Sequence, residues 1–252
     1  MKLKGKVAIV TGSSSGMGEA IAKEFAKEGA KVVVNYTRSA DAAAQIVDEI
    51  RKIDGEAIAI QADVSKIEDA KKLIDAAIKE FGTIDILVNN AGILDDYAPV
   101  LDTSEELWDK IMNINLKGQF LCCKFALPYM IEKEKGVIVN FSSIAGHVAG
   151  GGGAAYTAAK HGVIGLTKQI SFDYGKMGIR ANAVCPGAVK TRMTKEVFAD
   201  EDAPVMDAVR GVPAGRYGYP EEIAKLVLFL ASEDSEFIHG TDVVIDGGWI
   251  VQ

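Results

Sequence analysis

The chain has 252 residues, of which 48% are hydrophobic and 25% are charged, and this composition excludes an intrinsically disordered protein. Its net charge of −7 argues against nucleic acid as a partner, because proteins that bind many phosphates carry an excess of basic residues. No apolar run approaches the ~18 residues of a membrane span, and the N-terminus lacks the pattern of a signal peptide. We therefore expect a protein that neither spans a membrane nor is secreted.

The chain contains three cysteines, Cys122, Cys123 and Cys185. Their number is odd and no C-x-x-C spacing occurs, so the sequence predicts neither a disulfide framework nor a zinc site. We expect no bound metal and a reducing, cytoplasmic location.

Short β-branched runs alternate with amphipathic stretches along the chain. The expected strands are residues 6–10, 31–35, 57–61, 84–88, 136–141, 180–184 and 242–245. The clearest helical stretches are residues 18–28, 40–53, 66–81 and 104–130. Most strand runs are almost wholly apolar, which is typical of strands buried on both faces. The alternation predicts an α/β fold, a doubly wound Rossmann-type sheet of about seven parallel strands with helices on both faces, in one domain over residues 1–252.

Two stretches interrupt this alternation. Residues 149–154 form a glycine-rich run, which we interpret as a mobile loop or a place where backbones approach closely. Residues 186–220 form a long connection with four prolines. A connection of this length in a compact domain is usually functional, so we predict a substrate lid over residues 187–219.

The first expected strand runs into a glycine-rich turn, and a helix follows it. The turn has the spacing Gly12-x-x-x-Gly16-x-Gly18. Free backbone N–H groups at a helix N-terminus attract a pyrophosphate, and glycines let the backbone come close to it. The segment predicts a dinucleotide-binding site, and a turn that merely caps the helix is the alternative.

The end of the second expected strand bears on the choice of cofactor. A site selective for NAD usually places Asp or Glu here, whereas this chain has Tyr36, with Arg38 two residues later. A guanidinium binds phosphate bidentately, and no carboxylate is present to repel a 2′-phosphate. We predict NADP(H); NAD(H), with Arg38 as a solvated surface residue, is the alternative.

Tyr156 and Lys160 lie in an expected helix, where a spacing of four places both side chains on one face. A free tyrosine has a pKa near ~10 and is a poor acid–base catalyst at neutral pH. A nearby cation favours the phenolate and lowers that pKa. This spacing is common by chance, so its significance depends on the other motifs of the chain.

Several of those motifs occur together and in a fixed order. They are residues 11–18, Asn89-Asn90-Ala91-Gly92, Asn115, Ser142-Ser143, Tyr156 with Lys160, and Pro186-Gly187. Their order and spacing resemble those of the short-chain dehydrogenase/reductase family, over essentially the whole chain from Gly5 to Trp249.

The resemblance implies a catalytic role for several residues. Tyr156 would exchange the proton with the substrate oxygen, and Lys160 would lower the pKa of Tyr156 and hold the nicotinamide ribose. Ser143, thirteen residues before Tyr156, would orient the substrate oxygen, in preference to Ser142. Asn115 would hold a water in a proton relay to Lys160.

Cofactor contacts follow from the glycine-rich turn, the second strand and the resemblance. They are Gly12, Ser14, Ser15, Gly16, Met17, Gly18, Tyr36, Arg38, Asp63, Val64, Asn90, Ala91, Gly92, Tyr156, Lys160, Pro186, Gly187, Val189 and Thr191. For Asp63 the alternative is a cap of a local turn, and Pro186-Gly187 would otherwise simply end a strand. Asn113 is the alternative to Asn115 for holding the water of the proton relay. Asn89 is expected to tie strands together.

Four residues near these motifs carry no family role. We interpret His147 as a solvated loop residue, with a place in the substrate pocket as the alternative. We expect His161 to pack within its helix, and Asp95 and Asp96 to lie in a solvated loop.

The sequence therefore predicts hydride transfer between NADP(H) or NAD(H) and a small carbonyl or secondary alcohol. A 3-oxoacyl-carrier-protein reductase is the alternative, and it should show a basic patch for its acidic carrier. The basic candidates are Arg192, Lys195 and Arg210, and the acidic residues around them are Glu196, Asp200, Glu201, Asp202 and Asp207. A non-catalytic nucleotide-binding regulator is the alternative of another class. The resemblance also implies a homotetramer or homodimer.

Overall fold

The computed structural model describes residues 1–191, 194 and 204–251. A parallel seven-stranded sheet in the order β3-β2-β1-β4-β5-β6-β7 runs through this part of the chain. Its strands are β1 (Val7–Val10), β2 (Lys31–Tyr36), β3 (Ala57–Gln61), β4 (Ile86–Asn89), β5 (Gly136–Phe141), β6 (Ile179–Pro186) and β7 (Asp242–Ile245). The strand order changes direction between β1 and β4, where ligands bind in doubly wound sheets. The predicted fold is confirmed.

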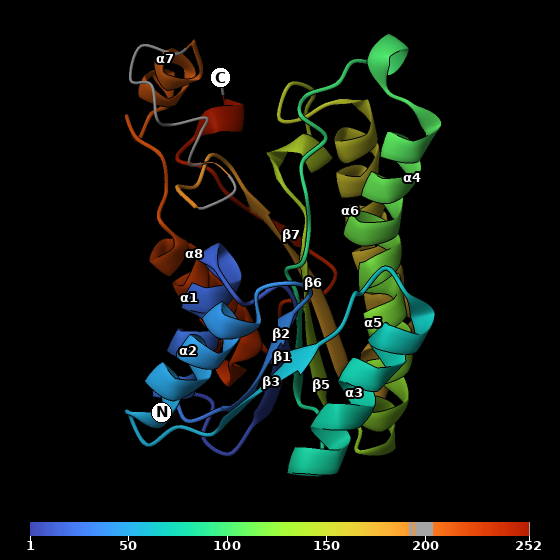
Figure 1. Cartoon of the computed structure of the whole chain (residues 1–252), viewed down its shortest axis with the longest axis vertical. Helices are drawn as coiled ribbons and strands as arrows, with labels where there is room; N and C mark the ends of the chain where they lie inside the picture. The colour runs from blue at the N-terminus through green and yellow to red at the C-terminus, as the bar shows by residue number, and fades with distance from the viewer. Residues whose placement is uncertain (192–193, 195–203, 252) are drawn as a thin grey trace.

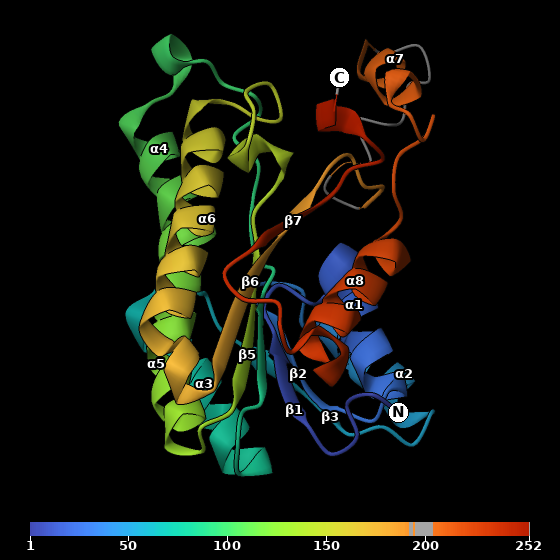
Figure 2. The ribbon, with the colours of Figure 1, turned by 180° about the vertical axis from the view of Figure 1, so that it is seen from behind.

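Helices cover both faces of the sheet (Figures 1 and 2). One layer contains α1 (Gly16–Lys27), α2 (Ala40–Arg51) and α8 (Pro220–Ala231). The other contains α3 (Ile67–Phe81), α4 (Glu105–Met112), α5 (Gly118–Glu132) and α6 (Ala154–Tyr174). The short helix α7 (Pro204–Gly211) lies beside the C-terminal segment, at the top of Figure 1.

The hydrophobic core has two large parts, one on each side of the sheet, because successive side chains of a strand point to opposite faces. A small third cluster, Ile111, Ala155 and Ala159, joins α4 to α6. Ala8 and Val10 of β1 pack in the cluster that includes α1, α2 and α8. Ile9, between them in sequence, packs in the cluster that includes α3 and α5. Fully burying a side chain of this size contributes roughly 1.5–3 kcal/mol, so strands that are apolar throughout stabilise both layers.

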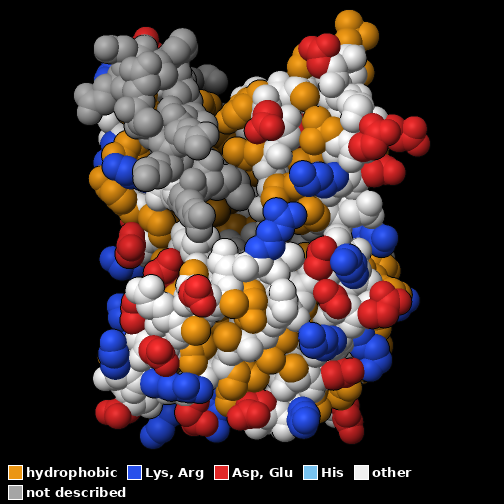
Figure 3. Space-filling view, in the orientation of Figure 1, with side chains coloured by type: hydrophobic (Ala, Val, Ile, Leu, Met, Phe, Trp, Pro, Cys, Tyr) orange, Lys and Arg blue, Asp and Glu red, His pale blue; other side chains and the backbone are white. Residues whose placement is uncertain are grey.

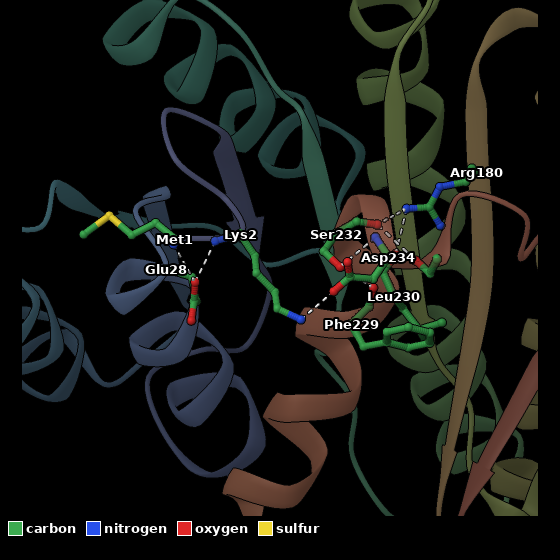
Figure 4. Close-up of polar contacts among 9 residues, drawn as sticks. Met1, Lys2, Glu28, Arg180, Phe229, Leu230, Ser232 and Asp234 are labelled. Atoms are coloured by element: carbon green, nitrogen blue, oxygen red, sulfur yellow. Dashed lines mark hydrogen bonds and ion pairs between the residues drawn. The ribbon is translucent and has the colours of Figure 1, made fainter.

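The amino ends of the strands are closed by structural contacts (Figure 4). Arg180 of β6 donates from Nη2 to the backbone oxygens of Leu230 and Ser232, at 3.0 Å each. These carbonyls belong to the end of α8, where they have no intrahelical partner and a positive charge is favourable. Lys2 pairs with Asp234 nearby. These contacts therefore stabilise the fold, and the predicted site residues gather at the opposite end of the sheet.

Two predicted segments differ in detail from the structure. The stretch 104–130 is three consecutive helical pieces, because a π-helical segment, Asn113–Lys117, separates α4 from α5. In the predicted lid, residues 192–193 and 195–203 lie outside the described residues. The lid charges among them are Arg192, Lys195, Glu196, Asp200, Glu201 and Asp202. Within the described ranges, no helix is both long enough and apolar enough to cross a membrane.

Candidate active site

The glycine-rich turn between β1 and α1 leaves space at the helix N-terminus. Gly12 and Gly16 have positive φ angles of 61° and 62°, a conformation that favours glycine. A Cβ on Gly18 would lie only 2.6 Å from the carbonyl oxygen of Gly12. The N-cap residue, Ser15, makes no side-chain hydrogen bond to the first turn of α1. The N–H groups of that turn are thus available for an anion, so these residues fit a bound pyrophosphate.

Two asparagines hold this turn from the neighbouring strands. Asn35 of β2 accepts from the N–H of Gly12 at 3.0 Å and donates to the carbonyl of Ala62 at 3.0 Å. Asn90, directly after β4, donates from Nδ2 to Thr11 at 2.9 Å and to Gly12 at 3.1 Å. The role of Asn35 was not predicted from the sequence, because it depends on the pairing of three strands.

The residues that follow β2 and β3 differ in how they are bound. The side chain of Arg38 is exposed and makes no hydrogen bond or ion pair within the described chain. The Asp63 carboxylate accepts from the N–H and the hydroxyl of Ser65, at 3.1 and 2.6 Å, so it does cap a local turn. Val64 is buried, and its side chain limits the space at Gly118. Arg38 is therefore open to a ligand.

Tyr156 and Lys160 lie on the same face of α6. The Lys160 Nζ atom is 5.2 Å from the centroid of the Tyr156 ring and donates to the backbone oxygen of Phe141 at 2.9 Å. Lys160 is 3% exposed, so its amine is held at one place inside the protein. Both residues line a cavity at the carboxyl ends of β4, β5 and β6.

Burial shifts the pKa values of both groups. It raises the pKa of Tyr156 to about 12, although hydrogen bonding with Ser143 opposes this shift. It lowers the pKa of Lys160 to about 8. Water stabilises the charged form of each group, so its removal disfavours phenolate and ammonium alike. The sequence led us to expect a lowered tyrosine pKa; in the protein on its own, the pKa is raised.

Ser142 and Ser143 both line the cavity but are bound differently. The Ser142 hydroxyl donates to the backbone oxygen of Lys160 at 2.8 Å and so fixes α6 to β5. Ser143 precedes a short 3₁₀ helix, Ile144–Gly146, and its Oγ accepts from the N–H of Ala145 at 3.1 Å. That bond leaves the Ser143 hydroxyl proton able to donate to a substrate oxygen.

Asn115 lies in the π-helical segment and is fully buried. Its side chain accepts from the N–H of Ile93 and donates to the Ile93 carbonyl, at 2.8 Å each. Its backbone oxygen accepts from Gln119 at 3.0 Å. Asn113, by contrast, accepts from the surface residue Lys117. π-Helical turns often occur at functional sites, and here the turn fixes the segment after β4 beside Lys160.

The cavity has a volume of about 450 Å³. The predicted site residues that line it are Met17, Asn90, Gly92, Ser143, Tyr156, Lys160, Pro186, Gly187, Val189 and Thr191. The remaining predicted residues do not line it. Asn115 lies in the π-helical segment, and the others lie at or after the ends of β1 to β4: Gly12, Ser14, Ser15, Gly16, Gly18, Tyr36, Arg38, Asp63, Val64 and Ala91. Large side chains that were not predicted also line it: Ile93, Leu94, Tyr97, Ile144 and Trp249. Figure 3 shows the molecule hollowed at this end, with hydrophobic side chains along the hollow.

Two residues near the site, Asp95 and His161, are not where the sequence placed them. Asp95, expected in solvent, is fully buried, whereas Asp96 is exposed. His161 is exposed and bonded to the carbonyl of Thr157, rather than packed in the interior. His147 does not line the cavity, and its Nε2 lies 3.2 Å from Asp242 of β7. Asn89 does tie strands together, since it donates to Asn140 of β5 at 2.9 Å. Within the described residues, no cluster of side chains fits a metal ion.

An anion cradle at a strand switch point, next to a partly buried tyrosine and a buried lysine, is typical of a class of nucleotide-dependent oxidoreductases. Comparison with known proteins specifies the family. A family model described as "Enoyl-(Acyl carrier protein) reductase" matches residues 12–250. The chain therefore belongs to the short-chain dehydrogenase/reductase family and is an enzyme that acts on hydroxyl or carbonyl groups.

Similar proteins with different named activities match the chain equally well. A 3-oxoacyl-[acyl-carrier-protein] reductase of Synechocystis sp. is 41% identical and covers 99% of this chain and 98% of its own. The 3beta-hydroxysteroid dehydrogenase 1 of Eggerthella lenta is also 41% identical, over 98% of this chain and 94% of its own. A solved short-chain type dehydrogenase/reductase from Mycobacterium marinum matches with a TM-score of 0.93 and 35% identity. The match covers 100% of this chain and 98% of the solved one.

Proposed function

We propose that this enzyme interconverts an uncharged, largely apolar ketone and its secondary alcohol. One observation carries the proposal: the hydroxyls of Tyr156 and Ser143 lie on the wall of a cavity that is otherwise mostly apolar. Among the described lining residues, Lys160 is the only Lys, Arg, Asp or Glu. Such a lining favours a neutral carbon skeleton, because an ionic group would lose its hydration without gaining a partner.

The side chains supply the proton for carbonyl reduction. With its pKa raised to about 12, Tyr156 is protonated at neutral pH and can donate its proton to the substrate oxygen. Ser143 donates a hydrogen bond to the same oxygen and orients it. Lys160, with a pKa of about 8, can return a proton to Tyr156 near neutral pH. A bound nicotinamide supplies the hydride, or accepts it in the reverse direction.

We further propose that NADPH is the preferred cofactor. The first support is the exposed guanidinium of Arg38. The second is that the end of β2 has Tyr36 in the place where NAD-selective sites usually have Asp or Glu. The remaining predicted contacts would hold the rest of the dinucleotide, and the relay role of Asn115 stays a prediction. Residues 187–219 are proposed as the substrate lid and a homotetramer or homodimer as the assembly.

The reduction of a 3-oxoacyl group on a carrier protein is the second candidate, and the identity to the Synechocystis enzyme favours it. An acidic carrier requires a basic docking surface. Of the predicted basic residues, Arg210 is described, and its guanidinium lies 3.4 Å from the carboxylate of Asp207. A nearby acid weakens the attraction of Arg210 for an anionic partner, so we place the neutral ketone first.

The two candidates are separated by one assay. Purified enzyme with NADPH is offered an alicyclic ketone, an acetoacetyl thioester of a small amine thiol and the same acyl group on a carrier protein. We expect the largest kcat/KM for the ketone. A preference for the carrier-bound substrate of tenfold or more would establish the second candidate. Absence of turnover with every substrate would contradict both, and Tyr156→Phe serves as the background control.

A further inference from the structure

The carboxylate of Asp95 makes two long-range contacts to the start of the catalytic helix. One oxygen accepts from the backbone N–H of Gly153 at 2.8 Å, and the other accepts from the N–H of Tyr156 at 2.8 Å. Asp95 is 0% exposed and makes no ion pair within the described chain. A buried carboxylate held only by backbone donors fixes those donors firmly, because charged hydrogen bonds are about twice as strong as neutral ones.

The helix has no cap of its own at this position. The N-cap residue of α6 is Gly153, which has no side chain and therefore cannot accept from the first turn. A Cβ at Gly153 would lie 2.5 Å from the backbone oxygen of Ala98, so the chain leaves no room for a local capping side chain. Ala98 also accepts from the N–H of Ala154 at 3.0 Å. The cap is thus supplied by the segment that follows β4.

We infer that Asp95 is a positioning residue for the reaction, which holds Tyr156 against the cavity through the backbone of the first turn of α6. The inference rests on the proposed function. The contact reaches the backbone N–H of Tyr156 itself, so its loss lets the tyrosine move relative to Ser143. Displacements of about 1 Å cost up to about a hundredfold in rate when a reacting group is misplaced.

The charge of Asp95 gives this role a separate signature. The titratable groups that face Tyr156 are Lys160 on the same helix, Asp95 and Tyr97 from the segment after β4, and, beside Lys160, Cys185 of β6. After burial, which is the main cause, the charges of Tyr97 and Asp95 also raise the pKa of Tyr156. Removing the Asp95 charge therefore lowers the pKa of Tyr156, because its phenolate is then less repelled.

The test compares Asp95→Asn with Asp96→Asn, its exposed neighbour. Asparagine offers one acceptor oxygen, so one of the two backbone donors loses its partner. We expect faster amide exchange at Gly153 or Tyr156, a fall in kcat for ketone reduction of about tenfold to a hundredfold, and a cofactor Kd close to wild type. The rise of alcohol oxidation with pH, which follows deprotonation of Tyr156, should move to lower pH. Asp96→Asn should leave all four measurements unchanged.

Two results would overturn the inference. The first is unchanged amide exchange at both residues in Asp95→Asn. The second is faster exchange and a lower Tm with unchanged kcat and pH profile, which would make Asp95 a cap for stability alone. If the asparagine variant does not fold, Asp95→Ser, which keeps one acceptor without the charge, carries the same measurements. If the wild-type enzyme reduces none of the ketones, the proposed function is contradicted instead. The amide-exchange measurements do not depend on turnover and still test the contact of Asp95 with α6.

Discussion

The glycine-rich turn offers the sharpest prediction, because a single methyl group at Gly18 has nowhere to go. Its Cβ would lie 2.6 Å from the Gly12 carbonyl oxygen and 2.6 Å from Nδ2 of Asn90. These two atoms are themselves joined by a hydrogen bond of 3.1 Å. Gly18→Ala therefore pushes apart the contact that fixes the turn.

The expected size of this effect follows from two terms. Forcing an extra carbon into packed surroundings costs roughly 1–3 kcal/mol, and losing the hydrogen bond costs about 0.5–1.5 kcal/mol. If the cofactor-bound state bears the whole cost, about 1.5–4.5 kcal/mol, the Kd of NADPH rises roughly 10- to 2000-fold. Titration calorimetry gives the Kd, and the Tm reports any part of the strain that the free protein bears.

The matched control is Gly165→Ala, because Gly165 also lies in a helix and a Cβ there meets nothing within 4 Å. It should leave the Kd of NADPH unchanged. A Kd for Gly18→Ala within about threefold of wild type, at an unaltered Tm, would refute the reasoning, since the added group would then cost less than 0.7 kcal/mol. That result would also remove the steric argument that the turn is shaped for a pyrophosphate.

Three further predictions concern catalysis and cofactor choice. Tyr156→Phe should lower kcat by about 10²–10⁴-fold without changing the Kd of NADPH, and retention of a tenth of the wild-type kcat would contradict the assignment. Ketone reduction should decline as the pH rises through about 8, because Lys160 then loses the proton that it returns to Tyr156; a flat pH profile from 7 to 10 would contradict this role. Arg38→Glu should reduce kcat/KM with NADPH by about tenfold or more and spare NADH, since it replaces a phosphate-binding charge by a repulsive one. Equal losses with both cofactors would show that Arg38 does not select.

Patterns that are local in sequence predicted the fold. The strand runs are apolar throughout, and the observed bounds of β3, β5 and β7 equal the predicted ones, residues 57–61, 136–141 and 242–245. The pair formed by Tyr156 and Lys160 also followed from local spacing, because four residues make about one helical turn. Information of this kind is carried by neighbouring residues and needs no knowledge of the tertiary structure.

Contacts between distant segments were beyond the reach of the same reasoning. Asp95 resembled a loop residue because its partners, Gly153 and Tyr156, are 58 and 61 residues away. His161 was expected to pack, but it points outward from α6, whereas its neighbour Lys160 is buried. The predicted direction of the pKa shift of Tyr156 was wrong for a related reason. Spacing reports that an amine is close, but burial depends on how many segments cover the pair.

The distribution of these distant contacts offers a reason why relatives of equal overall sequence identity have different named substrates. The chemical centre is held by reciprocal bonds such as those between Asn115 and Ile93, and by the backbone contacts of Lys160. Tyr97 and Trp249, by contrast, face the cavity from connecting segments outside the regular strands and α-helices. Two relatives with different named substrates are each 41% identical to this chain. We predict that differences in substrate arise in side chains of these segments, so exchanging the residues at Tyr97 and Trp249 should change specificity before it changes stability.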